Sequence, residues 1–102
     1  MEGLIYCAIS PSNKKYYGFA FDLETRKRRH ERHSKNLKDN TLFHRAIRKY
    51  GFEKFIWEIK EQHNVSKERE LLNIFYERET YWIKKENTFL SEYGYNMTLG
   101  GT

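Results

Sequence analysis

Glu79 stands at a position where packing alone would not put a carboxylate. The residues around it recur at helical spacing and predict one apolar helix face, made of Leu72, Phe75, Tyr76, Trp82 and Ile83. Glu79 falls in the middle of that face, and an ionised carboxylate is costly to bury without a partner. Two interpretations stay open: an ion pair or rim position, or a metal ligand or catalytic carboxylate held by packed neighbours.

A charged stretch earlier in the chain supplies a second set of reactive groups. Arg26, His30 and His33 are spaced by four and three residues, so a helix would carry them on one face, and Leu23 extends that face. A guanidinium can hold a phosphate through two parallel hydrogen bonds. The alternative is a solvated basic face, with the run RKRR at 26–29 acting as a general nucleic-acid patch.

Three tyrosines near the N-terminus are separated by strand alternation. In extended backbone, Tyr6 and Tyr16 share one face with small residues such as Gly18, whereas Tyr17 belongs to the opposite, bulky face and is expected in the core. Small residues leave room for a helix or a ligand to approach closely. The two tyrosines on the small face therefore either pack under a helix or line a site.

The elements that must position these groups follow from apolar patterning and turn residues. Residues 3–10 and 15–21 predict two strands joined by a turn that contains Pro11 and Asn13, and residues 55–61 predict a third strand. The expected fold class is therefore mixed α/β (α+β), with a three-stranded antiparallel sheet flanked by helices.

Three helices are expected around this sheet. Asp22 is a candidate cap for the first helix, from Leu23 to His33. Asn40 or Thr41 would cap the second, which ends at Gly51 and carries an apolar stripe of Leu42, Phe43, Ala46, Ile47 and Tyr50. Ser66 is the expected cap of a long third helix that reaches about residue 86, and the glycine-rich tail is expected to be irregular.

Length and composition limit the class of protein. The 102 residues indicate one domain, 1–102, and the net charge of +5 favours polyanionic partners, nucleic acid before an anionic membrane. The single cysteine, Cys7, excludes a disulfide framework within the chain and a cysteine-based zinc cluster. Neither a membrane-spanning run nor a signal-peptide pattern is recognisable, so the expected location is intracellular, in the cytoplasm or nucleus of a host cell.

The remaining histidines and the cysteine are interpreted as structural residues without a role in chemistry. His33, His44 and His63 are interpreted as surface or packing residues, and Cys7 as a small core residue on the bulky strand face.

The ordered set of motifs resembles the GIY-YIG nuclease domain. The resemblance rests on Tyr6 in Gly-Leu-Ile-Tyr, the Tyr16-Tyr17-Gly18 triplet, Arg26, His30, Glu79 and the Gly94-Tyr95-Asn96 run, and it spans essentially the whole chain. The first motif is one residue longer than the name-giving triplet, the second has tyrosine in the middle, and Phe19 follows where smaller or polar residues are usual. The glycine-rich ending resembles the homing-endonuclease and viral branch.

The resemblance implies hydrolysis of a DNA phosphodiester with one divalent metal ion, Mg²⁺ (or Mn²⁺). By the family's pattern Glu79 would hold the metal and Arg26 would contact the scissile phosphate. Tyr6 would be the tyrosine proposed to deprotonate the attacking water. Because the reference pKa of tyrosine is about 10, we expect Tyr6 and His30 to share the proton transfer, and the base stays unassigned between them.

Two further residues complete the implied site. Tyr16, together with His30, would complete the hydrogen-bonding shell around the nucleophile, and Asn96 would lie at the far edge of the site as a positioning or bracing residue.

Alternative functions stay open at this stage. The chief alternative is a non-catalytic basic DNA-binding module of the same fold, and the second is a basic protein–protein interaction domain. The chain is short for an enzyme that reads many base pairs, and its LGGT ending is a place where a linker could begin. It is interpreted either as the catalytic part of a longer protein or as a low-specificity nuclease; the sequence assigns neither a target nor an oligomeric state.

Overall fold

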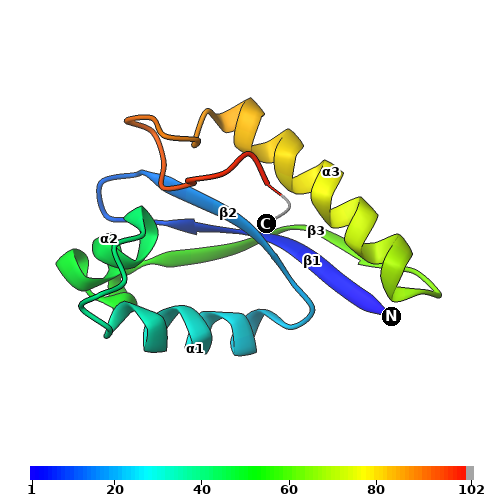
Figure 1. Ribbon diagram of the computed structural model, residues 1–102, viewed down its shortest axis with the longest axis horizontal. Coiled ribbons are helices and arrows are strands. Elements are labelled where there is room, and N and C mark those ends of the chain that lie inside the picture. The colour runs from blue at the N-terminus through cyan, green and yellow to red at the C-terminus, as the bar shows by residue number, and fades with distance from the viewer. Residues whose placement is uncertain (101–102) are drawn as a thin grey trace.

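The computed structural model describes residues 1–100, which form one antiparallel sheet with helices on both faces (Figure 1). The strands are β1 (Glu2–Ile9), β2 (Lys15–Ala20) and β3 (Ile56–Asn64), in the order β2-β1-β3. The helices are α1 (Leu23–Ser34), α2 (Leu42–Tyr50), a short 3-10 turn η1 (Phe52–Lys54) and α3 (Glu68–Glu86). The expected fold class is confirmed. In the part of the chain that the structure describes, no helix has both the length and the apolarity that a bilayer span needs.

The β1–β2 hairpin has the strand register that alternation predicts. Tyr6 lies opposite Gly18 and Ala8 lies opposite Tyr16, so the small residues and the two tyrosines share one face. Tyr17 lies opposite Cys7 on the other face, where both are fully buried. The separation of Tyr6 and Tyr16 from the core residue Tyr17 is therefore confirmed.

Helix α3 covers the bulky face of the sheet. One cluster joins Ile5 to Leu71 and Phe75, and a second joins Cys7 and Tyr17 to Ile83. The buried residues of α3 are Leu71, Phe75, Glu79 and Ile83, a series spaced by four.

The predicted composition of this helix face was wrong at two positions. Leu72 and Tyr76 are 43% and 56% exposed, whereas Leu71 is fully buried. The reason is the phase of the helix: the four-residue series through Phe75 and Glu79 turns toward the sheet, so Leu72 and Tyr76, each one residue after a buried member of the series, face solvent.

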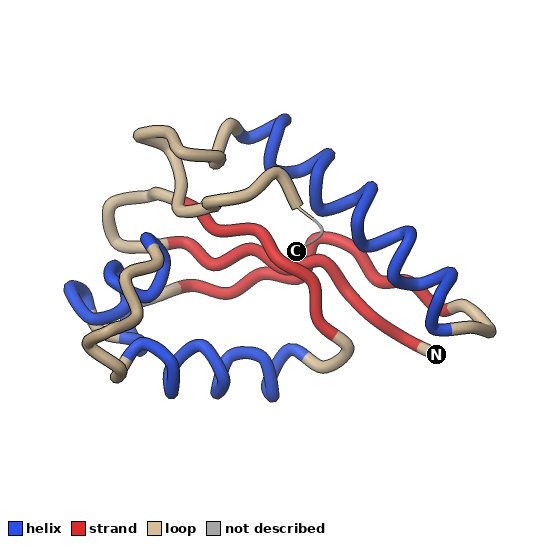
Figure 2. Tube along the Cα trace, viewed as in Figure 1, coloured by secondary structure: helices blue, strands red, loops and turns tan. Residues whose placement is uncertain are grey.

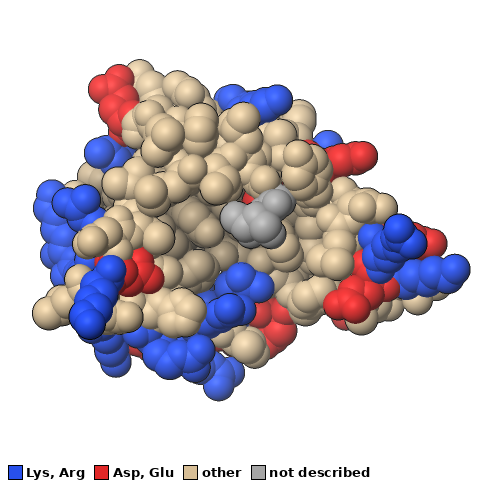
Figure 3. All heavy atoms as spheres, viewed as in Figure 1, with Lys and Arg blue, Asp and Glu red and all other residues tan. Residues whose placement is uncertain are grey.

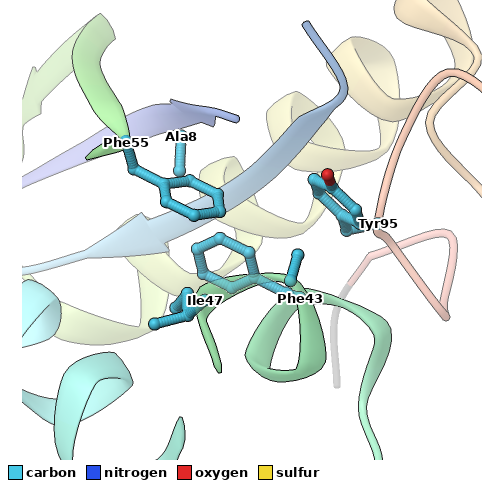
Figure 4. Packing of buried hydrophobic residues seen from close by; sticks show 6 residues of the cluster. Ala8, Phe43, Ile47, Phe55 and Tyr95 are labelled. Carbon is cyan, nitrogen blue, oxygen red and sulfur yellow. The ribbon is translucent and has the colours of Figure 1, made fainter. Parts of the chain in front are cut away.

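The second face of the sheet is covered by α1 and α2. Phe43 and Ile47 from α2 pack with Ala8 and with Phe55, and Tyr95 from the C-terminal segment closes the cluster (Figure 4). The predicted stripe of α2 is confirmed, because Leu42 and Tyr50 pack at the edge of the same cluster.

The helix caps predicted from the sequence agree with the structure in part. Asp22 caps α1 by accepting a hydrogen bond from the backbone N–H of Thr25 at 3.1 Å. Thr41 is the N-cap of α2 without a side-chain bond, and Gly51 ends it at a φ of 97°, a conformation that favours glycine. The prediction for Ser66 was wrong, because α3 begins at Glu68 after Lys67.

The C-terminal segment runs beside β2 and holds its edge (Figure 2). The backbone N–H of Tyr95 donates to the carbonyl of Lys15 at 2.9 Å. The Asn96 amide bonds both backbone groups of Tyr17: its Oδ1 accepts from the N–H at 3.0 Å, and its Nδ2 donates to the carbonyl at 2.8 Å. Thr88 donates to the same Oδ1 at 2.8 Å. The tail has no strand within the described residues, yet it acts as a brace for β2.

We expect Asn96→Asp to destabilise the fold although the side chain keeps its shape. The carboxylate loses the donor that meets the carbonyl of Tyr17 and places a negative charge against that carbonyl instead. The expected cost is about 2–3 kcal/mol of unfolding free energy, or a melting temperature lower by at least about 10 °C.

Thermal unfolding followed by circular dichroism measures this effect. Asn73→Asp is the matched control, since Asn73 is exposed on α3 and gains the same charge. Equal melting temperatures for the two variants would contradict the bracing role of Asn96.

Candidate active site

A cavity of about 240 Å³ brings together all six residues that the sequence singles out. Its lining includes Tyr6, Tyr16, Arg26, His30, Glu79 and Asn96. Glu79 comes from α3, on one face of the sheet, while Arg26 and His30 come from α1, on the other (Figure 1). The two layers meet beside the edge strand β2, whose Tyr16, Gly18 and Phe19 also line the cavity.

Gly18 makes the space that Tyr6 occupies. The two residues are direct partners across the hairpin, and Tyr6 is only 1% exposed. A Cβ atom on Gly18 would lie 2.5 Å from the Tyr6 hydroxyl oxygen and 2.7 Å from the ring carbon that carries it. Any side chain at position 18 would therefore displace the hydroxyl.

The Tyr6 hydroxyl is held by His30. Its oxygen lies 2.7 Å from Nε2 of the His30 ring, and both groups are buried. The His30 ring packs edge-on against Phe43 and Tyr16, with centroid distances of 4.9 and 5.5 Å. Tyr16 in turn stacks on Phe43 at 4.2 Å with nearly parallel rings. These aromatic contacts leave the imidazole little freedom to turn.

Two further residues, His44 and Asp39, extend the series of hydrogen-bond contacts on the other side of the His30 ring. His30 Nδ1 lies 2.9 Å from His44 Nε2, and His44 Nδ1 lies 2.7 Å from Asp39 Oδ2. His44 is buried and lines the cavity, so it is not a surface residue. Sequence reasoning missed both residues. The available signal was the place of His44 in the helix, next to Phe43 on the stripe that packs against the sheet.

The other two histidines make no hydrogen bond to this chain of contacts among the described residues. The His33 ring meets the His44 ring with centroids 5.9 Å apart, and His63 bonds Glu61 at 2.8 Å outside the cavity. Both side chains are partly exposed, which agrees with the interpretation of His33 and His63 as surface or packing residues.

Burial sets the protonation states of the two tyrosines, Tyr6 and Tyr16, and of His30. Desolvation, followed by Tyr16 and the Glu79 carboxylate, raises the pKa of Tyr6 well above its usual value. Desolvation and Glu79 raise the pKa of Tyr16 to about 12. Desolvation, helped by His44 and Arg26, lowers the pKa of His30 to about 3. At neutral pH the two phenols are protonated and His30 is uncharged, so one of its ring nitrogens donates a hydrogen bond and the other accepts one.

Arg26 brings positive charge to the lining of the cavity. Its guanidinium carbon lies 5.9 Å from the centre of the Phe19 ring, and that ring stacks on Phe75 at 4.7 Å. The Phe19 ring thus faces the guanidinium group, which gives the bulky residue at this position a physical use. A half-buried guanidinium facing a cavity is suited to bind an anion such as phosphate through paired hydrogen bonds.

Glu79 is the residue that could hold a metal ion here. It is 7% exposed and lies between the buried Phe75 and Ile83, so its backbone is held rigidly. Within residues 1–100, no three His, Cys, Asp or Glu side chains gather closely enough to form a cation site by themselves. A single carboxylate on an open cavity suits Mg²⁺, which keeps several waters and takes further oxygens from a phosphate.

Two of three comparisons relate the chain to known proteins. A family model, described as the GIY-YIG catalytic domain, matches residues 2–96. A structure of the catalytic domain of homing endonuclease I-TevI is 30% identical, with a TM-score of 0.72 over 94% of this chain and 98% of that chain. A glutamate-to-alanine mutant of the catalytic domain of intron endonuclease I-TevI is 29% identical, with a TM-score of 0.77 over 96% and 95%. A comparison with curated proteins found no match.

We expect Gly18→Ala to disturb the Tyr6–His30 contact while the sheet still forms. The added methyl overlaps the Tyr6 hydroxyl, which must move or push the strands apart, at a cost of about 1–3 kcal/mol. Thermal unfolding measures the stability, and the nitrogen chemical shifts of the His30 ring report whether Nε2 keeps its partner.

A double-mutant cycle with Tyr6→Phe tests the cause of the loss. Removing the hydroxyl removes the nearest overlap, so the double variant should be more stable than the sum of the single changes predicts. Strict additivity would show that Gly18 acts for another reason.

Proposed function

Because the chain belongs to the family of GIY-YIG catalytic domains, we propose that it is a metal-dependent endonuclease that hydrolyses a phosphodiester bond of DNA. The observation that carries this proposal is the convergence of Arg26, Glu79 and the Tyr6–His30 pair on one cavity. Hydrolysis of a phosphodiester needs charge neutralisation on the phosphate and removal of a proton from the attacking water, and these residues supply both.

Arg26 and Glu79 are assigned to the phosphate and the metal. The guanidinium of Arg26 would bind non-bridging oxygens of the scissile phosphate. Glu79 would hold one Mg²⁺ (or Mn²⁺), which supplies Lewis-acid stabilisation of charge when bound. Glu79 from α3 and Arg26 from α1 line the same cavity from different elements, which supports this division of roles.

Tyr6 and His30 are assigned to proton transfer. The raised pKa of Tyr6 disfavours a free phenolate, so Tyr6 is a poor base by itself. An uncharged His30 within 2.7 Å can accept the hydroxyl proton while Tyr6 receives one from water. We therefore assign the base to the pair, with Tyr16 packed beside it and Asn96 bracing the adjacent strand.

A second groove supports the proposal that the substrate is DNA. It has a volume of about 380 Å³, adjoins the first cavity at Tyr95, and is lined by Lys14, Arg45 and Lys49. In Figure 3 Lys and Arg side chains gather over the parts of this face where α2 and α1 lie. A strand whose scissile phosphate sits at Arg26 would place neighbouring phosphates in this groove.

We expect Glu79→Gln to abolish cleavage while the fold remains. The amide is a weak ligand for Mg²⁺, and its volume matches that of the carboxyl group. Nicking of supercoiled plasmid with Mg²⁺, Mn²⁺ or chelator measures the effect, and the expected loss is at least about 100-fold.

Binding of labelled duplex DNA to the same variant is the control for folding and for substrate affinity. A parent protein that binds DNA and never cleaves it would favour the non-catalytic DNA-binding module. A parent that neither binds nor cleaves DNA would favour the protein-interaction alternative.

We expect the double change Arg45→Ala with Lys49→Ala to weaken the affinity for DNA more than it lowers the rate at which bound DNA is cleaved. Each lost phosphate contact should reduce the slope of log affinity against log salt by about 0.9. Fluorescence anisotropy over a salt series measures this slope.

The matched control is Lys67→Ala with Arg69→Ala, which removes the same charge from the exposed start of α3. If both double variants change the slope equally, the groove is not part of the DNA path.

A further inference from the structure

We propose that Asp39 and His44 are positioning residues for the proton-transfer pair, because they hold His30 in the tautomer whose Nε2 lone pair faces Tyr6 and receive the charge that His30 gains. The catalytic part of this proposal rests on the proposed nuclease function. The geometric part concerns the resting protein and holds independently of it.

Four side chains form one continuous series of short contacts. Tyr6 Oη lies 2.7 Å from His30 Nε2, His30 Nδ1 lies 2.9 Å from His44 Nε2, and His44 Nδ1 lies 2.7 Å from Asp39 Oδ2. Tyr6, His30 and His44 are 1%, 8% and 8% exposed, so water competes little for these positions. Every ring nitrogen of the two histidines is engaged in this series.

The direction of each hydrogen bond follows from the charge of Asp39. Burial would raise its pKa, but hydrogen bonds from Thr41 and His44 outweigh burial and lower it to about 2, so the carboxylate only accepts. His44 must then donate from Nδ1 and, while uncharged, accept at Nε2. His30 consequently donates from Nδ1 and accepts at Nε2, and Tyr6 donates its hydroxyl proton to His30.

Asp39 is itself fixed by the loop between α1 and α2. Its Oδ1 accepts from the backbone N–H and the hydroxyl of Thr41, at 3.0 and 2.8 Å, which leaves Oδ2 for His44. The guanidinium of Arg48 donates to the backbone carbonyls of Ser34, Asn36 and Asp39, at 3.0, 3.1 and 2.8 Å. These hydrogen bonds fix the loop. They therefore also fix the Asp39 carboxylate, the acceptor that sets the direction of the hydrogen bonds in the series.

The same series accounts for the destination of the proton. The attacking water would give a proton to Tyr6 Oη as Tyr6 gives its own proton to His30 Nε2. His30 would then pass the Nδ1 proton to His44 Nε2, leaving His30 uncharged and His44 as an imidazolium beside the Asp39 carboxylate. Burial and the nearby His44 and Arg26 disfavour a lasting positive charge on His30. The Asp39 carboxylate, whose Oδ2 lies 2.7 Å from His44 Nδ1, is placed to pair with the proton that leaves His30.

Asp39→Asn tests the proposal because the substitution keeps the shape and reverses the hydrogen bonds. The two donors of Thr41 would retain the amide oxygen, so the amide N–H would face His44 Nδ1. His44 must then donate from Nε2, and His30 must accept at Nδ1 and donate from Nε2. The Tyr6 hydroxyl would meet a donor in place of an acceptor.

Two measurements are made on the full chain. Long-range nitrogen–proton NMR of the parent should show His30 and His44 protonated at Nδ1, and both should change to Nε2 in Asp39→Asn. Plasmid cleavage with Mg²⁺ should fall at least about 100-fold in kcat with KM nearly unchanged, the range expected for loss of acid–base assistance. His63→Gln is the matched control, since it removes a carboxylate-paired histidine outside the cavity.

A double-mutant cycle separates positioning from structural damage. In a His30→Ala background Asp39→Asn should cost little further activity, because the residue acts through His30. Full additivity, or a parent with His30 protonated at Nε2, would overturn the proposal. Cleavage by Asp39→Asn at the parent rate would overturn its catalytic part. An inactive parent with the expected tautomers would instead reject the nuclease function and leave the geometric part standing.

Discussion

The hydrogen bond between Tyr6 and His30 is the contact on which the arrangement of this protein depends. It links the central strand to α1, a helix so rich in charge that its buried residues are His30 and Ser34. With so little apolar surface to bury, α1 cannot be positioned by hydrophobic packing alone. A buried imidazole that meets a tyrosine on one side and a histidine on the other supplies the missing specificity.

This contact constrains residues far from it in sequence. The Tyr6 hydroxyl needs a residue without a side chain opposite it, and Gly18 meets that need. The His30 ring needs aromatic walls, which Tyr16 and Phe43 provide from β2 and α2. Buried polar groups of this kind are costly when a partner is missing, so each member helps to keep the others in place. The same low solvent access keeps the tyrosines protonated and His30 uncharged.

Much of the fold was predictable because it follows from local rules. Strand alternation separated Tyr6 and Tyr16 from Tyr17, and the cap at Asp22 was confirmed. Apart from the cap of α3, the errors arose where a choice depends on neighbours in space. Leu71 rather than Leu72 is buried because the sheet selects the phase of α3, and helical spacing tolerates either residue. His44 was missed because its partners, His30 and Asp39, approach it only after α1 and α2 have packed together.

The sequence by itself determined the strands, the helices and the chemical identity of the groups that line the cavity, because periodicity, caps and motif order are local properties of the chain. Only the tertiary structure decided that Glu79 and His30, carried on opposite faces of the sheet, meet at the edge of β2. It also placed Asp39 Oδ2 2.7 Å from His44 Nδ1, and from this contact we infer the direction of the hydrogen bonds in the series. Distances between separate elements result from packing, and no spacing along the chain encodes them.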